Sequence, residues 1–331
     1  SVCAENLCFL VCFFFFVVVW LRMSSPFSVA SKVVRASWFD GYCCTLLLPR
    51  ELVHLGMGYR SLLATAQQSS IVSPTSGTSS PIPSADTPPL ALLKITALHE
   101  EVSQWASKGC PSSHAHPLFA ATAHPVFDDP LTRAKLLRAV GHWRREVAEP
   151  GVPDTAALYR RSDATHLALF RTLLTAAGCT DEADHRAASH LARAYTLATV
   201  LRSVPALARA TGTVDLPRDA LLRNDVSAHR DVVRVATGEP QHTDADAQAR
   251  LATAARELAQ EAVDWLRAAG KEEPSPVARR ILLPGVMAAT WLDKLRAAHF
   301  NVFDPAIGAT PRILPATLWW SAHRGKIGAD I

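Results

Sequence analysis

Glycine and charged residues are both scarce in this chain of 331 residues. Its 15 glycines are too few for sites built from repeated glycine-rich loops. Charged residues make up 19% and hydrophobic residues 49% of the chain, which excludes a wholly disordered protein because such chains are rich in charge and poor in core-forming side chains. The formal net charge is only +4 and no basic stripe is present. We therefore expect no DNA partner and do not favour RNA.

Several common catalytic and metal-binding motifs are missing as well. The letters D-E-A-D begin at Asp181, but no G-x-x-x-x-G-K-[ST] phosphate loop accompanies them, so we interpret Asp181 as the start of a helix. The 13 histidines include no H-E-x-x-H pair, and no G-x-S-x-G turn occurs. The seven cysteines include no C-x-x-C pair. These absences predict reduced thiols, no metal site and no cofactor.

The first forty residues differ in character from the rest. Residues 7–21 are fifteen apolar residues in a row, and a helix of that length spans about 22 Å, less than the hydrocarbon core of a bilayer. We interpret residues 1–22 as a doubtful leader outside the protein proper, with a genuine anchor or signal as the alternative. Residues 23–39 are rich in serine, carry Lys32 and Arg35 and lack acids. This composition is typical of a mitochondrial transit peptide, and an ordinary disordered N-terminus is the alternative.

The remainder is predicted to be one all-α domain over residues 40–324. Residues 69–89 interrupt it, because sixteen of these 21 residues are Ser, Thr, Pro or Gly and predict a disordered insertion. Beyond the insertion, apolar residues recur every three to four positions. This spacing predicts helices over 90–105, 131–147, 156–177, 183–207, 243–270 and 285–300, with a bend or end at Pro205 and starts at Thr243 and Ser275.

Residues 181–217 and 291–324 carry a resemblance to the squalene/phytoene synthase family. Within that family they look most like the branch that serves as a mitochondrial complex I assembly factor. The resemblance covers about residues 35–324 and implies the all-α isoprenoid synthase-like helical bundle. The residues that resemble the branch's own signature are Asp184, His185, His190, Pro217, Phe303, Asp304 and Pro305.

The resemblance also implies where catalytic carboxylates would lie. Active members of the family hold Mg²⁺ with two Asp-rich motifs on facing helices. By spacing, the first motif falls on Gln67, Gln68 and Ile71, and no Asp or Glu occurs anywhere over residues 52–85. The second motif falls on residues 199–207, beginning at Thr199. Arg202 matches the arginine of the motif, whereas Ser203, Ala206 and Leu207 replace its three acids. Arg202 either pairs with an acid for structural reasons or meets a ligand.

The resemblance therefore implies a protein without enzymatic activity that assists the assembly of mitochondrial respiratory complex I. The alternatives are an assembly factor for another complex such as the mitochondrial ribosome, and an active enzyme that condenses prenyl diphosphates. We expect protein partners in a mitochondrial assembly intermediate, in the matrix or in association with the inner membrane. Whether a vestigial cavity is filled by side chains or holds a lipid is left open.

Overall fold

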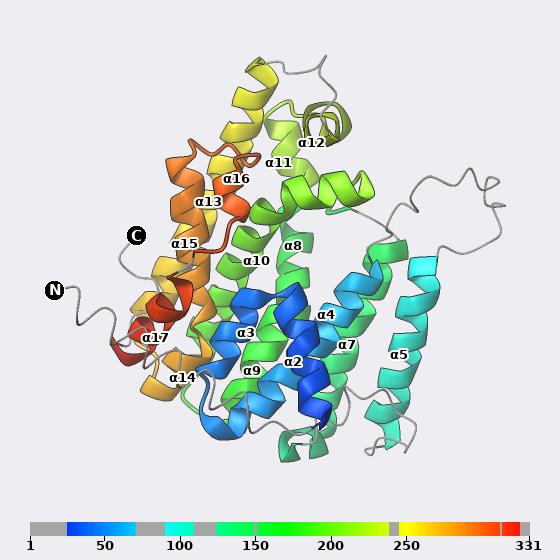
Figure 1. Ribbon diagram of the computed structural model, residues 1–331, viewed down its shortest axis with the longest axis vertical. Helices are drawn as coiled ribbons and strands as arrows, with labels where there is room; N and C mark the ends of the chain where they lie inside the picture. Colours follow the sequence, from blue (N-terminus) through cyan, green and yellow to red (C-terminus); the bar gives the residue numbers. More distant parts are fainter. Residues whose placement is uncertain are drawn as a thin grey trace.

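A computed structural model describes residues 25–70, 90–108, 124–148, 151–237, 245–311 and 313–324. These residues form helices joined by turns, and the described ranges contain no strand. None of the helices in these ranges is both long and apolar enough to cross a membrane. The chain order of the helices can be followed in Figure 1. Their bounds are α2 Ser25–Ser37, α3 Phe39–Leu46, η1 Arg50–Leu52, α4 Val53–Ser70, α5 Leu90–Lys108, η2 Pro125–Asp128, α7 Pro130–Ala148, α8 Thr155–Ser162, η3 Asp163–Leu167, α9 Ala168–Ala176, α10 Glu182–Thr211, α11 Arg218–Arg223, η4 Ala228–Val233, α12 Arg234–Thr237, α13 Ala245–Lys271, α14 Pro276–Ile281, α15 Pro284–Ala297, α16 Pro305–Gly308 and α17 Leu314–Arg324.

Helix α10 lies at the centre of the bundle. Its buried side chains include Leu191, Ala192 and Val200, which point to different sides because successive residues are rotated by about 100°. A helix that is apolar on all sides has to be surrounded by other elements. Figure 1 shows α13 and α15 on one side of α10, with α8 and α9 on the other. Any site in the bundle interior is therefore built around α10.

Two predicted helix starts are found in the structure, whereas one helix predicted to bend or end at a proline continues beyond it. Asp181 accepts a hydrogen bond from the Ala183 amide at 2.9 Å, and Ser275 accepts one from Ala278 at 3.2 Å, so both predicted starts are confirmed. The predicted start at Thr243 lies outside the described residues. Helix α10 does not end at Pro205 but continues to Thr211.

Helix α2 lies within the stretch predicted to be a transit peptide. It packs against α4 and α3, and its Ala30 and Val34 side chains are completely buried in the core. The packed helices therefore include one that lies before residue 40, and the domain start at residue 40 stays a prediction. The removal of residues 23–39 as a transit peptide stays a prediction, and residues 1–22 lie outside the described residues.

The predicted insertion begins later than its composition suggests. Helix α4 runs to Ser70, so residues 69 and 70 are helical, and residues 71–89 lie outside the described residues.

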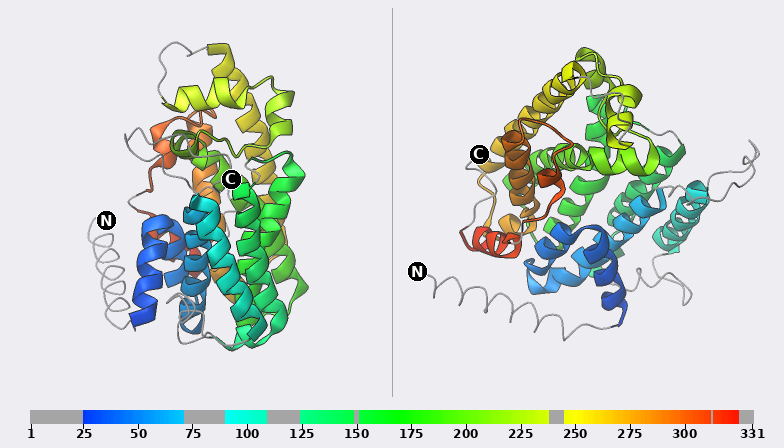
Figure 2. Two further views of the ribbon diagram at one scale, coloured as in Figure 1. Left: turned by 90° about the vertical axis from the view of Figure 1, so that its right-hand side faces the viewer. Right: turned by 45° about the horizontal axis from the view of Figure 1, so that its top comes forward.

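At one end of the bundle, Figure 2 shows α11, η4 and α12 gathered around the first turns of α13. The other end holds the first turns of α10 and the short helix α14.

Candidate functional site

Arg202 of α10 forms an ion pair with Asp40 of α3. Its Nη1 atom lies 2.6 Å from Asp40 Oδ2, and the Asp40 side chain is only 8% exposed. The Arg202 guanidinium also lies over the Trp291 ring of α15, 4.4 Å from the ring centroid, and its Nη2 donates to the Gly308 carbonyl of α16 at 3.4 Å. Of the two alternatives for Arg202, pairing with an acid is therefore the one that the structure contains.

The other residues of the second predicted motif carry no carboxylate. The Thr199 hydroxyl donates to the Tyr195 carbonyl at 2.7 Å, and the Ser203 hydroxyl donates to the Val200 carbonyl at 3.0 Å. Both hydroxyls thus satisfy carbonyls of their own helix. Ala206 is exposed and Leu207 is partly buried, and neither side chain has an atom that could bind a metal.

The first predicted motif lies at the end of α4. Gln68 is exposed there, and its Nε2 donates to the Ser37 hydroxyl of α2 at 2.5 Å. Gln67 is partly buried, and Ile71 lies outside the described residues. The amide of Gln68 therefore helps to join α4 to α2.

A row of rings fills the interior next to the Arg202–Asp40 pair. Ring centroids are 6.4 Å apart for Trp38 and His166, 4.9 Å for His166 and Tyr195, and 5.7 Å for Tyr195 and Trp291. His166 Nδ1 lies 2.9 Å from the Thr196 hydroxyl. Burial, with the nearby cations Arg60 and Arg161, lowers the pKa of His166 to about 3, so this histidine is neutral at physiological pH.

Arg60 of α4 is a second cation in this interior. It is only 2% exposed, and its position depends on a glycine of α3. A Cβ atom added at Gly41 would lie 3.2 Å from Arg60 Nη1, closer than side chains normally approach. The absence of a side chain at residue 41 therefore makes room for the guanidinium beside α3.

Lys294 of α15 fixes the segment that carries Phe303, Asp304 and Pro305. Its Nζ donates to the carbonyl of Ala306 at 3.0 Å and also to that of Ala309. Burial and the charge of Arg202 lower the pKa of Lys294. Together with the Arg202–Gly308 hydrogen bond, these contacts hold α16 against α10 and α15.

The predicted signature residues do not form one cluster. Asp184 is 1% exposed and accepts hydrogen bonds from the Ser275 amide at 2.7 Å and hydroxyl at 2.8 Å. His190 stacks on Trp265 at 5.3 Å and lies 3.5 Å from Glu272. Asp184 is about 27 Å from Arg202 along the helix axis.

The other signature residues cap or pack short helices. Asp304 accepts a hydrogen bond from the Ala306 amide at 2.8 Å, with Pro305 in the first turn of α16. Pro217 directly precedes α11, and Phe303 is partly buried against the core. His185 is partly buried on the first turn of α10. Their geometry is that of residues that position helices.

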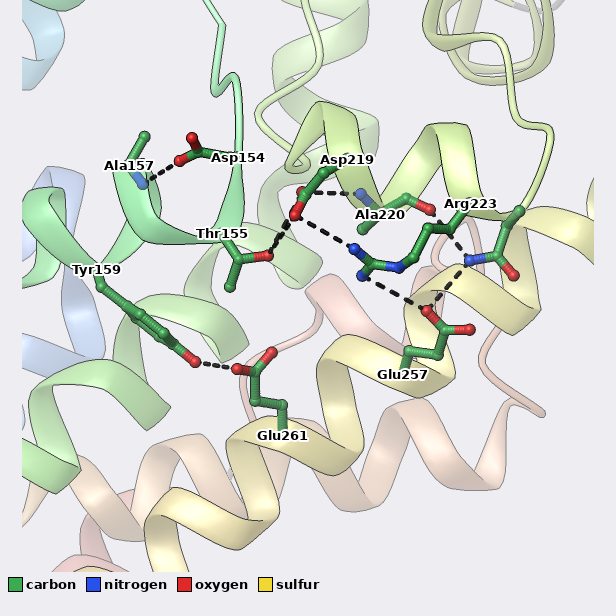
Figure 3. Close-up of polar contacts among 10 residues, drawn as sticks. Asp154, Thr155, Ala157, Tyr159, Asp219, Ala220, Arg223, Glu257 and Glu261 are labelled. Carbon is green, nitrogen blue, oxygen red and sulfur yellow. Dashed lines mark hydrogen bonds and ion pairs between the residues drawn. The ribbon is translucent and has the colours of Figure 1, made fainter.

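A separate polar network joins α8, α11 and α13 (Figure 3). Thr155 donates to Asp219 at 3.3 Å, and Arg223 bridges Asp219 at 3.2 Å and Glu257 at 3.8 Å. The Tyr159 hydroxyl also donates to a carboxylate of α13, as Figure 3 shows. The carboxylates drawn there are engaged with donors, so this network connects helices and contains no predicted site residue.

The match to a known protein family extends across most of this helical bundle. A family model described as Squalene/phytoene synthase matches residues 76–317. The chain belongs to this family. It is also 26% identical over 288 residues to a Drosophila melanogaster protein named NADH dehydrogenase (ubiquinone) complex I, assembly factor 6 homolog. That match covers 86% of this chain and 79% of the Drosophila protein.

Solved structures show the same fold. The squalene synthase HpnC from Alicyclobacillus acidocaldarius has a TM-score of 0.60 at 16% identity, covering 83% of this chain and 95% of that one. A dehydrosqualene synthase solved in complex with a ligand has a TM-score of 0.65 at 14% identity, covering 90% and 95%. The predicted all-α isoprenoid synthase-like bundle is therefore confirmed.

The residues at the two motif positions do not fit the Mg²⁺ ions that the family implies. Mg²⁺ requires several hard oxygen ligands, mainly carboxylates and water. Asp40 is the carboxylate of this site, and it is engaged by the cation Arg202. Within the described ranges, no three His, Cys, Asp or Glu side chains lie close enough together to hold a metal ion.

Sequence reasoning missed Asp40, His166 and Tyr195 as site residues. Asp40 is the first acid after residue 5 and precedes an apolar stretch, so its isolation was a usable signal for a buried ion pair. No such signal marks His166 or Tyr195, because their rings meet only when η3 packs against α10.

Proposed function

We propose that this protein is a non-catalytic member of its family that assists the assembly of mitochondrial respiratory complex I. The missing acids of the second motif carry the proposal, because Ser203, Ala206 and Leu207 stand where the resemblance places its three carboxylates. Arg202 matches the arginine of that motif and is paired with Asp40. Gln67 and Gln68 likewise supply no carboxylate at the first motif. The name of the Drosophila relative supports complex I as the client.

An assay for prenyl transfer tests the absence of catalysis. The purified protein is incubated with farnesyl diphosphate and Mg²⁺, and an active dehydrosqualene synthase is treated in parallel as a control. We expect no condensation product and no release of diphosphate above the level without protein, since a metal-held leaving group is required. Product that depends on Mg²⁺ and on this chain would overturn this part of the proposal.

Deletion of the gene tests the client complex. We expect the amount of assembled complex I on native gels to fall, while the other respiratory complexes and the mitochondrial ribosome stay at normal levels. Re-expression of the wild-type chain should restore complex I. Normal complex I after deletion contradicts the proposal, and an earlier loss of mitochondrial ribosomes would favour the alternative client.

Location in the mitochondrion forms part of the same proposal. A chain synthesised in vitro is expected to enter isolated mitochondria in a manner that depends on the membrane potential. Determination of the mature N-terminus then tests the transit peptide over 23–39. A start after these residues supports removal, whereas a retained α2 contradicts it and agrees with the burial of Ala30 and Val34.

A further inference from the structure

A cavity of about 570 Å³ lies between α7 and the segment formed by α8 and η3. This volume is typical of sites for small ligands. Ala157 and Ala164 supply part of its apolar lining, and none of the residues around the Arg202–Asp40 pair contributes to it. Helix α8 forms one wall of the cavity, and two contacts hold its first turn in place. The Asp154 carboxylate accepts a hydrogen bond from the Ala157 amide at 2.6 Å, and the Thr155 hydroxyl donates to Asp219, as Figure 3 shows.

Three basic side chains of α7 line one wall of the cavity. Arg138, His142 and Arg145 are spaced at i, i+4 and i+7, so they share one face of the helix and all three line the cavity. Both arginines are exposed, and neither has a carboxylate partner in the part of the chain that the structure describes. Arg160 adds a third cation from α8, 3.7 Å from the exposed Asp154, at a separation where a surface ion pair contributes little.

The main carboxylate of the cavity is already engaged. Glu146 accepts a hydrogen bond from Arg161 Nε at 2.6 Å, its Oε1 also lies 2.6 Å from Arg161 Nη2 in an ion pair, and it lies 3.0 Å from His142. Burial raises the pKa of Glu146, but the hydrogen bond from His142 and the charge of Arg161 outweigh burial and lower it overall. Arg161 in turn pairs with Asp215 at 2.9 Å. Asp163 is the one other acid that lines the cavity in the described ranges, and it is exposed to water.

We propose that this cavity binds the phosphate group of a small ligand between Arg138, Arg145 and Arg160. Arginine matches phosphate oxygens with paired N–H donors, and its charge is retained at any physiological pH. The apolar lining accommodates the organic part of the ligand. The phosphate can come from a soluble phosphate monoester or from the terminal phosphate of phosphatidic acid in a membrane, and both sources present the same phosphate monoester group to the arginines.

Two binding measurements with the full chain separate the sources. Calorimetric titration with inorganic phosphate tests a soluble anion, and co-sedimentation with phosphatidylcholine vesicles, with and without phosphatidic acid, tests a headgroup. We expect saturable binding at one site in at least one arm. Arg138→Gln combined with Arg145→Gln should weaken it at least about tenfold, since two charge-assisted contacts are lost. The matched control removes two exposed arginines elsewhere, Arg171→Gln and Arg280→Gln, and should bind like the wild type.

A second variant keeps the test decisive if the double substitution does not fold. Ala157→Glu places a carboxylate in the cavity at the third position of α8, where glutamate suits a helix N-terminus. It should abolish binding without lowering the unfolding temperature. The proposal is overturned if the wild type binds neither probe saturably, or if the Arg138/Arg145 variant and the Arg171/Arg280 control bind equally. A signal only with phosphatidic acid vesicles assigns the site to a headgroup.

Discussion

Replacing Arg202 by methionine should destabilise the protein by about 3 kcal/mol. The Asp40 carboxylate is 8% exposed, and leaving one partner of a buried pair uncompensated costs about 3–5 kcal/mol. Arg202 itself is 23% exposed, so some water reaches the pair and places the cost near the lower limit. Loss of the cation over Trp291 adds about 0.5–1 kcal/mol, while methionine retains the apolar contact with that ring.

A double-mutant cycle with Asp40→Asn isolates the ion pair. Urea unfolding followed by tryptophan fluorescence gives the free energy of unfolding for the wild type, both single variants and the double variant. We expect a coupling energy of about 2 kcal/mol, as for a hydrogen bond between charged groups. The exposed Arg171→Met on α9 is the control and should cost less than about 0.5 kcal/mol.

One result would refute this account of Arg202. If Arg202→Met costs less than about 1 kcal/mol and the coupling energy is zero, the guanidinium does not stabilise the fold through Asp40. Arg202 would then be free to meet a ligand, and its assignment as a structural residue would be wrong.

Three further predictions concern titration, helix packing and thiol chemistry. The folded-state pKa of His166 is lowered to about 3 from an ordinary value of 6.5. Between these two values the unfolded chain binds more protons than the folded protein, so the free energy of unfolding should fall as pH drops below 6.5, with a limiting slope of about 1.4 kcal/mol per pH unit. Unfolding titrations of His166→Gln should show a flatter dependence on pH. Asp184→Ala removes both acceptors of Ser275 and should cost about 3 kcal/mol in urea unfolding, and a cost below about 1 kcal/mol would contradict the buried contact. Burial raises the pKa of Cys43 to about 12 and also raises that of Cys44, so iodoacetamide at pH 8 should modify both far more slowly in the folded protein than in urea, as peptide mass spectrometry can check.

Much of the fold followed from local patterns in the sequence. Apolar spacing predicted the long helices, and short-range capping chemistry placed their starts at Asp181 and Ser275, because an N-cap involves only neighbouring residues. Helix α10 does not end at Pro205, because the packed surroundings of α10 outweigh the loss of one backbone hydrogen bond. The packing of α2 was not predicted, because the burial of Ala30 and Val34 depends on the distant helix α4.

The sequence by itself determined that no acid occurs over residues 52–85, and that Ser203, Ala206 and Leu207 stand where the resemblance places the acids of the second motif. Only the tertiary structure decided what Arg202 contacts. Asp40 and Arg202 are 162 residues apart in the chain, and they meet only because the folded bundle brings this part of α3 within reach of α10. Likewise Arg138 and Arg145 of α7 come to line the same cavity as Arg160 of α8 only in the folded protein. Contacts between residues far apart in sequence depend on the arrangement of whole helices, which local patterns do not encode.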